Sequence, residues 1–202
     1  MTISRRLFFA TLAAGAVSTP ALAEDVPAPD LSQEPFTVKD DENKIEYKYR
    51  RRQMAYNTSE APGTIIVDPK ARFLYYVLGN GQAIRYGVSV GKQGRTWSGA
   101  ATIGRMEKWP TWTPTPEHLA EFPKLVKYLN GGMPGGLDNP MGARALYLYQ
   151  GDVDTVYRIH GTYDPSFIGR KKTAGCVSLL NVDAIDLYNR VQMGTKVVVL
   201  EY

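Results

Sequence analysis

The sequence predicts a mainly β fold, a β-rich sandwich or barrel with one long loop and one or two short helices. Runs of β-branched and aromatic residues alternate with Gly, Asn, Asp and Pro, which is the pattern of strands joined by turns. Only two segments, which begin near residues 115 and 181, have the cap residues and the apolar spacing of helices. Many short strands with little helix are typical of sandwiches and barrels.

Residues 1–23 predict an export signal. A short basic start that contains Arg5 and Arg6 precedes an apolar stretch of 11 residues and an Ala-Leu-Ala ending. These are the three parts of a secretory signal peptide, and the apolar stretch is shorter than the about 20 residues that span a bilayer. The two arginines also fit a twin-arginine signal, so two export routes remain open. We expect an exported chain that begins near Glu24 and has no membrane span.

Residues 24–62 are rich in Pro and charge and show no sustained periodicity, which predicts a leader or linker. The basic group at 47–52 could touch an anionic surface, but it is more typical of a solvated charge run. From Gly63 the pattern changes to strands, so residues 63–202 are expected to form the folded domain. The predicted strands are residues 64–68, 72–78, 83–90, 145–150, 155–160 and 195–201.

Residues 97–142 are dense in Trp, Pro and Gly, and a connection this long with little regular structure is typical of a functional lid. Within it, Thr115 as cap and Pro116 at the first position predict a short helix that Pro123 interrupts. His118 on this helix is expected to be exposed.

A second helix is predicted from residue 181 to residue 193, with Gly194 at its C-terminal end. Asp183 and Asp186 lie three residues apart near its start, where the helix dipole favours carboxylates. We expect them to be surface carboxylates and not an acid–base pair.

The charge balance argues against a nucleic-acid partner. The chain has 24 Lys and Arg against 20 Asp and Glu, and without Arg5 and Arg6 this becomes 22 against 20, a net charge of +2. A single cysteine cannot form an intramolecular disulfide, and one thiol with two histidines matches no zinc motif. We expect no metal and no cofactor.

Residues 87–91 match the Gly-x-Ser-x-Gly pattern of serine hydrolases, which requires a helix directly after the serine. Ser89 lies in an alternating strand pattern followed by Lys, Gln, Gly and Arg, so we expect it to be a strand residue. The glycine-rich residues 131–136 lack the Lys and Ser or Thr of a phosphate-binding loop and are expected to be a plain loop.

The strongest candidate site combines His-Gly-Thr at 160–162 with Thr-Ala-Gly-Cys at 173–176. A lone cysteine in an exported protein is either a buried apolar group or a reactive thiol, and Cys176 alone does not decide between them. Together with His160 it forms a candidate Cys–His pair for acyl transfer. The basic residues 170–172 could favour a thiolate or could form a solvated loop, and the sequence leaves both open.

In such a pair, His160 would accept the thiol proton, the Cys176 thiolate would attack a carbonyl, and the imidazolium would protonate the leaving amine. Backbone N–H groups of Gly175 and Cys176 are the expected oxyanion donors. Neither Asp nor Asn is uniquely placed to orient the imidazole, so a backbone carbonyl could hold its second nitrogen.

These motifs resemble the signature of the L,D-transpeptidases, the YkuD-type catalytic domain, in which His-Gly-Thr is followed by Ser or Thr, any residue, Gly-Cys, Ile or Val, and Arg. Further stretches at residues 110–116, 135–142 and 186–197 are also similar to bacterial periplasmic members. The resemblance extends over residues 63–202.

The resemblance implies a β-rich sandwich that carries Cys176 in a cleft under a cap formed by residues 97–142. It also implies a periplasmic enzyme that acts on peptidoglycan and needs no cofactor. Its thiol would attack a tetrapeptide stem and release the terminal D-alanine. The acyl group would then pass to an amine, which gives 3→3 cross-links. A protein amine is a further acceptor in the family, and carbapenems acylate the cysteine in many members. Gly161, Thr162, Thr173 and Ser178 would be orienting or substrate-loop residues.

The sequence departs from the family pattern at Ser178, where an arginine usually stands. Serine cannot replace the planar fork of arginine, which puts the acceptor preference in doubt. Arg170, Lys171 or Lys172 could compensate. A hydrolase of the same fold, either a carboxypeptidase or an amidase that releases wall-linked protein, and a non-catalytic wall-binding domain are the alternatives.

Overall fold

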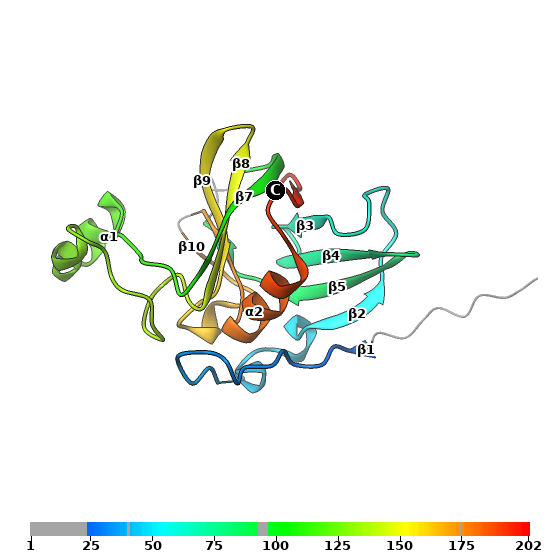
Figure 1. Cartoon of the computed structure of the whole chain (residues 1–202), viewed down its shortest axis with the longest axis horizontal. Coiled ribbons are helices and arrows are strands. Elements are labelled where there is room, and N and C mark those ends of the chain that lie inside the picture. The colour runs from blue at the N-terminus through cyan, green and yellow to red at the C-terminus, as the bar shows by residue number, and fades with distance from the viewer. Residues whose placement is uncertain (1–23, 40, 93–96, 174) are drawn as a thin grey trace, which may run out of the picture.

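One sheet curls over on itself to form the two layers of a sandwich (Figure 1). The structure is a computed structural model that describes residues 24–39, 41–92, 97–173 and 175–202, so the predicted export signal lies outside the described residues. In these residues the sheet has ten strands, in the order β1 (Glu24–Asp25), β2 (Arg52–Ala55), β5 (Gln82–Gly87), β4 (Phe73–Gly79), β3 (Ile65–Asp68), β12 (Lys196–Val199), β7 (Gly99–Lys108), β8 (Arg144–Gln150), β9 (Val153–His160) and β11 (Val177–Ser178).

Two further strands, β6 (Val90–Gly91) and β10 (Lys171–Thr173), pair with each other in parallel. The described α-helices are α1 (Pro116–Glu121) and α2 (Asn181–Arg190). The described 3₁₀-helices are η1 (Glu42–Lys44), η2 (Tyr47–Tyr49), η3 (Pro123–Tyr128) and η4 (Pro165–Phe167). In the part of the chain that the structure describes, no helix has the length and apolar character needed to cross a membrane.

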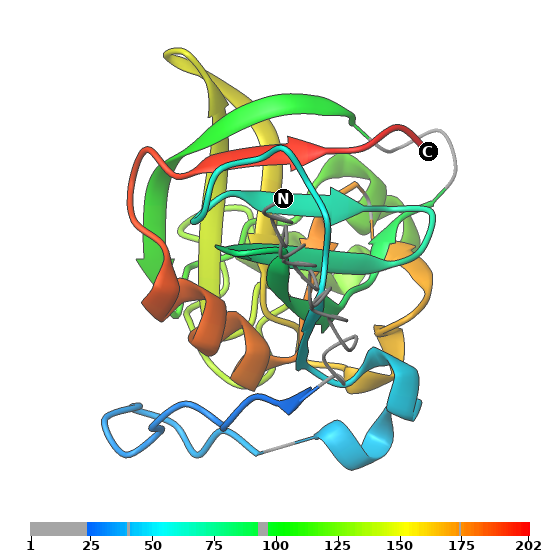
Figure 2. The ribbon, with the colours of Figure 1, turned by 90° about the vertical axis from the view of Figure 1, so that its right-hand side faces the viewer.

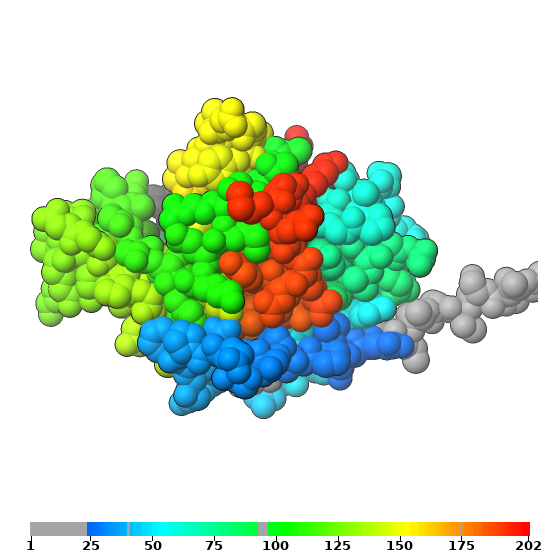
Figure 3. Space-filling model, in the orientation of Figure 1, coloured from blue at the N-terminus to red at the C-terminus, as the bar shows by residue number. Residues whose placement is uncertain are grey.

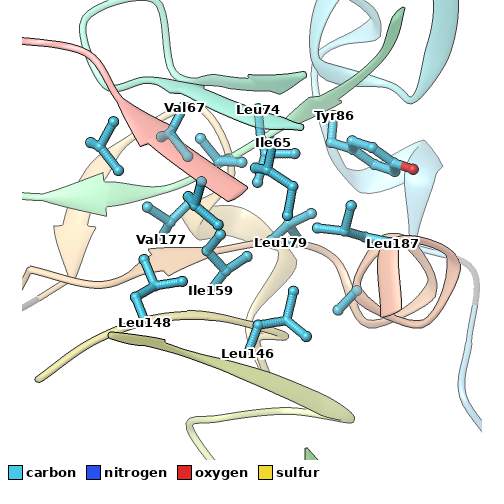
Figure 4. Packing of buried hydrophobic residues seen from close by; sticks show 14 of the residues in the cluster. Ile65, Val67, Leu74, Tyr86, Leu146, Leu148, Ile159, Val177, Leu179 and Leu187 are labelled. Atoms are coloured by element: carbon cyan, nitrogen blue, oxygen red, sulfur yellow. The ribbon is translucent and has the colours of Figure 1, made fainter. Parts of the chain in front are cut away.

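The core lies between the two layers of the curled sheet (Figure 4). Ile65 and Val67 on β3 enter it from one layer, and Leu146, Leu148 and Ile159 on β8 and β9 enter it from the other. All five side chains are at most 2% exposed. Because residues two apart on a strand share a face, this packing places the intervening residues of β9 on the outer face of the sheet.

The six predicted strands are confirmed as β3, β4, β5 with β6, β8, β9 and β12. Ser89 is a fully buried residue between β5 and β6, bridged to Ser178, and its hydroxyl donates to the Arg170 carbonyl at 3.1 Å. The prediction of little regular structure over residues 97–142 was wrong for its first part, because β7 takes up Gly99–Lys108. Small residues at the start of β7 hide the strand pattern, and its pairing with β8 and β12 supplies the order.

Both predicted helices are present. The Thr115 hydroxyl accepts the His118 N–H, as expected for a cap, but the His118 ring bonds back to Thr115 and is partly buried instead of exposed. The second helix ends at Arg190, three residues earlier than predicted, because Val191 adopts an extended conformation. Gly194, with a φ of 84°, belongs to the turn into β12 and does not terminate the helix.

The described part of residues 24–62 is not the linker that its composition predicts. β1 and β2 extend the sheet by pairing with each other and with β5. Val38, Ile45 and Tyr49 form a second apolar cluster with Val182 and Ile185 of α2. Figures 2 and 3 show this segment lying along one side of the domain beneath α2. The hydrophobic contacts are spread over distant residues, which is why no local periodicity marks them.

The acidic pair on α2 is buried and not on the surface as expected. Asp183 is fully buried and accepts a hydrogen bond from Arg51 at 2.7 Å, so the basic group at 47–52 is only partly solvated. Asp186 is 5% exposed and accepts hydrogen bonds from Tyr86 at 2.6 Å and from Arg190 at 2.9 Å. The N-terminal segment thus pairs with Asp183 through Arg51, while Asp186 is bound by Tyr86 of β5 and by Arg190 of α2.

Replacing Arg51 by Met is expected to lower the free energy of unfolding by about 3–5 kcal/mol, because it removes one member of a buried ion pair. The matched control is Lys48→Met, which breaks a solvent-exposed pair with Glu46 and should change stability far less. Urea unfolding of both variants measures the difference. Equal losses would show that the Arg51–Asp183 pair adds nothing beyond a surface pair.

Candidate active site

The parallel pairing of β11 with β9 brings the two predicted catalytic residues to one place. Val177 pairs with Ile159, and Ser178 pairs with His160. Val177 and Ile159 face the core, so His160 lies on the opposite face of the sheet. Cys176 immediately precedes β11 on that same face, next to Arg158, whose backbone is hydrogen-bonded to the thiol.

His160 is held as a neutral base. His160 is 8% exposed, and Nδ1 of its ring lies 2.6 Å from the carbonyl oxygen of Gly161. The carbonyl can only accept, so Nδ1 carries the proton and Nε2 keeps a free lone pair. Burial lowers the pKa of His160 to about 4, and the charge of Arg158 adds to this effect. A backbone carbonyl thus takes the orienting role for which the sequence offered no acidic side chain.

Cys176 as a whole residue is partly exposed, and it is not in a disulfide. Burial raises the pKa of the Cys176 thiol, and the backbone and positive charge of Arg158 act against this rise. At neutral pH Cys176 is therefore a protonated thiol and His160 is a neutral imidazole. Such a thiol becomes a nucleophile when a neighbouring base accepts its proton.

Gly161 permits the close packing behind the imidazole. A Cβ at this position would lie 2.2 Å from the Asn181 side-chain oxygen and 3.0 Å from the Ala143 nitrogen. The Gly161 N–H donates to the Arg144 carbonyl at 3.0 Å, and the His160 carbonyl accepts from Leu179 at 2.9 Å. The carbonyl that orients the ring is thus part of a tightly held backbone.

Thr173 and Gly175 shape the turn before the thiol. The Thr173 hydroxyl donates to the Cys176 carbonyl and accepts the Gly175 N–H at 3.4 Å. Gly175 has a φ of 144°, which few other residues adopt. The role of the Gly175 and Cys176 N–H groups as oxyanion donors remains a prediction, and the long Gly175 bond leaves that donor weakly held.

Thr162 and Ser178 are buried within the fold. Thr162 is 4% exposed, and its hydroxyl bonds to the backbone of Asp164. Ser178 is 1% exposed, and its backbone pairs with Ser89 in both directions. Neither hydroxyl is presented at the surface, so the arginine that usually follows the cysteine has no exposed counterpart at Ser178.

Arg158 is a residue that the sequence analysis missed. Its guanidinium holds Asp154 with two bonds of 2.7 and 2.8 Å and lies 4.5 Å from the centre of the Tyr147 ring. Its position two residues before His160, on the same face of a predicted strand, was the available signal. Residues 170–172 are exposed, so this basic group is solvated, but Lys171 and Lys172 belong to strand β10 and not to a loop.

A small cavity of about 20 Å³ lies beside this site and is lined in part by Arg158, Gly175 and Trp97. It has room for about one water molecule. The segment with α1 and η3 projects from the body of the domain (Figure 1). Among the described residues, no group of three or more His, Cys, Asp or Glu side chains is placed to hold a metal ion.

Replacing Arg158 by Met is expected to slow alkylation of Cys176 by iodoacetamide roughly threefold at pH 8, because removing a nearby positive charge raises the thiol pKa further. The rate measured against pH should shift toward higher pH. Lys172→Met, which removes an exposed charge, is the control. An unchanged profile in the Arg158 variant would contradict the electrostatic role.

A cysteine directly before β11 and an oriented imidazole at the end of β9, on a β-sandwich, are the arrangement that the sequence predicts for a cysteine-dependent domain. The family model described as YkuD, L,D-transpeptidase catalytic domain, matches residues 62–199. The chain belongs to the L,D-transpeptidase catalytic-domain family.

Named relatives agree with this assignment. The probable L,D-transpeptidase ErfK/SrfK of Escherichia coli K12 is 32% identical over 143 residues, which are 69% of this chain and 44% of that protein. This chain thus matches less than half the length of that relative. An open reading frame of Fuscovulum blasticum, provisionally named an L,D-transpeptidase, is 31% identical over 98% of both chains.

Two solved structures are similar in fold. A Brucella melitensis protein described as a probable carnitine operon oxidoreductase is 47% identical, with a TM-score of 0.53 over 79% of this chain and 98% of that one. A cysteine-to-serine mutant of the Enterococcus faecium L,D-transpeptidase is 17% identical, with a TM-score of 0.51 over 69% of this chain and 50% of that one. The second likeness concerns the fold alone.

Proposed function

We propose that this chain is an exported peptidoglycan L,D-transpeptidase with Cys176 as its nucleophile. The observation that carries the proposal is the pairing of β9 with β11, which brings Cys176 and a neutral, oriented His160 to the same face of the sheet. Membership of the L,D-transpeptidase family supports the reaction class.

In the first half-reaction, Nε2 of His160 accepts the thiol proton while the sulfur attacks the carbonyl of the third residue of a tetrapeptide stem. The bond to the terminal D-alanine breaks, its nitrogen takes the proton from the imidazolium, and a thioester remains on Cys176. The buried imidazole suits this step, since its low pKa makes it ready to give the proton back.

In the second half-reaction, an amine attacks the thioester and loses a proton to His160, which returns it to the departing thiolate. A side-chain amine of a second stem gives a 3→3 cross-link, and a protein amine would give a wall-linked protein. The predicted signal at residues 1–23 would deliver the chain to the periplasm, where these substrates occur.

The test incubates the full chain with disaccharide tetrapeptide, with and without a free D-amino acid, and determines the product masses. A cross-linked dimer, or exchange of the terminal residue for the added amino acid, is expected. Tripeptide as the only product would contradict the transferase and support the hydrolase. No product from the donor would contradict both.

A further inference from the structure

One carboxylate of the N-terminal segment binds both ends of the projecting segment. Glu34 accepts a hydrogen bond from the Trp109 indole at 2.8 Å and is held by two guanidinium nitrogens of Arg144, one of them at 3.0 Å. Trp109 directly follows β7 and Arg144 begins β8, so they flank residues 110–143, which contain α1 and η3.

This contact is buried and strong. The Glu34 and Arg144 side chains are 9% and 2% exposed. Although burial alone would raise it, the pKa of Glu34 is lowered, because Arg144 and Trp109 donate to the charged carboxylate. The Phe36 ring packs edge-on against Trp109, with ring centres 4.6 Å apart. An arginine this deeply buried would lose much of its stabilisation without its carboxylate.

A short series of bonds links the same contact to His160. The backbone carbonyl of Arg144 accepts the Gly161 N–H at 3.0 Å, and the Gly161 carbonyl orients the imidazole at 2.6 Å. Next to Arg144, the Ala143 carbonyl accepts both the Trp109 N–H and the Arg144 guanidinium, each at 2.8 Å. The position of the Arg144 backbone therefore affects the orientation of the His160 imidazole.

We propose that Glu34 is a positioning residue, which holds the two ends of the segment 110–143 together and keeps the Arg144 backbone in register behind His160. The proposal rests on the proposed function for its effect on turnover. Figure 3 shows the N-terminal segment lying against the side of the domain beneath α2. The catalytic unit then includes Glu34, which lies in the segment that the composition marks as a leader.

The test compares Glu34→Gln with Glu46→Gln in the full chain. Glutamine keeps the shape of the side chain and removes its charge, and Glu46 is an exposed residue of the same segment that pairs with Lys48. For Glu34→Gln, kcat with a tetrapeptide donor should fall about tenfold to a hundredfold, as expected when a base is slightly displaced. Glu46→Gln should retain the activity of the unchanged chain.

Amide hydrogen exchange gives a readout that does not depend on turnover. In Glu34→Gln, exchange should accelerate over residues 110–143 and at Gly161, while the strands β3 and β4 stay protected. An acceleration spread evenly over the whole domain would indicate general destabilisation and would overturn the proposal. So would unchanged exchange, or a loss of kcat matched by the fraction of unfolded protein.

The two proposals fail in different ways. If the unchanged chain does not turn over the donor but Glu34→Gln loosens residues 110–143 and Gly161 selectively, the proposed function is wrong and the positioning role stands. If the unchanged chain is active and Glu34→Gln matches it in both kcat and exchange, the positioning role is wrong and the proposed function stands.

Discussion

Replacing Cys176 by Ala is expected to abolish thioester formation and to lower the turnover of tetrapeptide donors by at least about a thousandfold, because the variant has no nucleophile to form the covalent intermediate. Intact-protein mass spectrometry after mixing with donor measures this directly. The unchanged chain should gain the mass of the acyl group, and the variant should gain nothing.

The Cys176 variant is also expected to fold normally. Cys176 makes no disulfide, and Ala removes only one heavy atom, the sulfur, from its side chain. Thermal unfolding of the variant checks this point. A folded Cys176→Ala chain that still turned over donor would contradict the entire mechanism, including the hydrolase alternative that shares the thioester.

Replacing His160 by Gln should lower the rate of acylation by about 10²–10⁴-fold, the usual contribution of a general base. In the proposed mechanism the imidazole accepts the proton from a thiol whose pKa is raised by burial. Without it, only the small fraction of thiolate reacts. The rate is measured by mixing the enzyme with a tetrapeptide donor, quenching the reaction at set times and determining the acylated fraction by intact-protein mass spectrometry.

The pH dependence of the acylation rate should differ between the unchanged chain and the His160→Gln variant. Because the pKa of His160 is about 4, its base form predominates above that pH, so the rate of the unchanged chain should rise as the pH increases through about 4 and then level off. In His160→Gln the rate should keep rising tenfold per pH unit toward the thiol pKa. His118→Gln, which alters the cap of α1, is the control and should show the same pH profile as the unchanged chain. A His160→Gln variant with that same profile would contradict the general-base role.

The elements that the sequence predicted correctly are those whose signal is local. The strands β3, β4, β8 and β9 carry β-branched and aromatic runs bounded by turn residues, and α1 carries its own cap in Thr115. The Cys176 and His160 motifs are also local patterns, and the catalytic roles of the two residues stay predictions.

The misplaced features depend on contacts between distant residues. β7 is ordered by its neighbours β8 and β12, while its own sequence begins with small residues. The sequence predicts Asp183 at the surface, whereas in the structure it is paired with Arg51, which lies 132 residues earlier in the chain. Arg158 has no motif of its own, and its place beside the thiol follows from strand register, which a sequence does not display.

The sequence by itself determined that this protein has one thiol and one matching histidine in an L,D-transpeptidase motif, on a chain built mostly of strands. Only the tertiary structure decided that His160 is neutral and held by a carbonyl, and that Arg158 is the cation beside the thiol. It also decided that the N-terminal segment is part of the domain. The physical reason is that residue types and spacing set local chemistry, whereas burial, register and the partners of charged groups arise only when distant segments pack together.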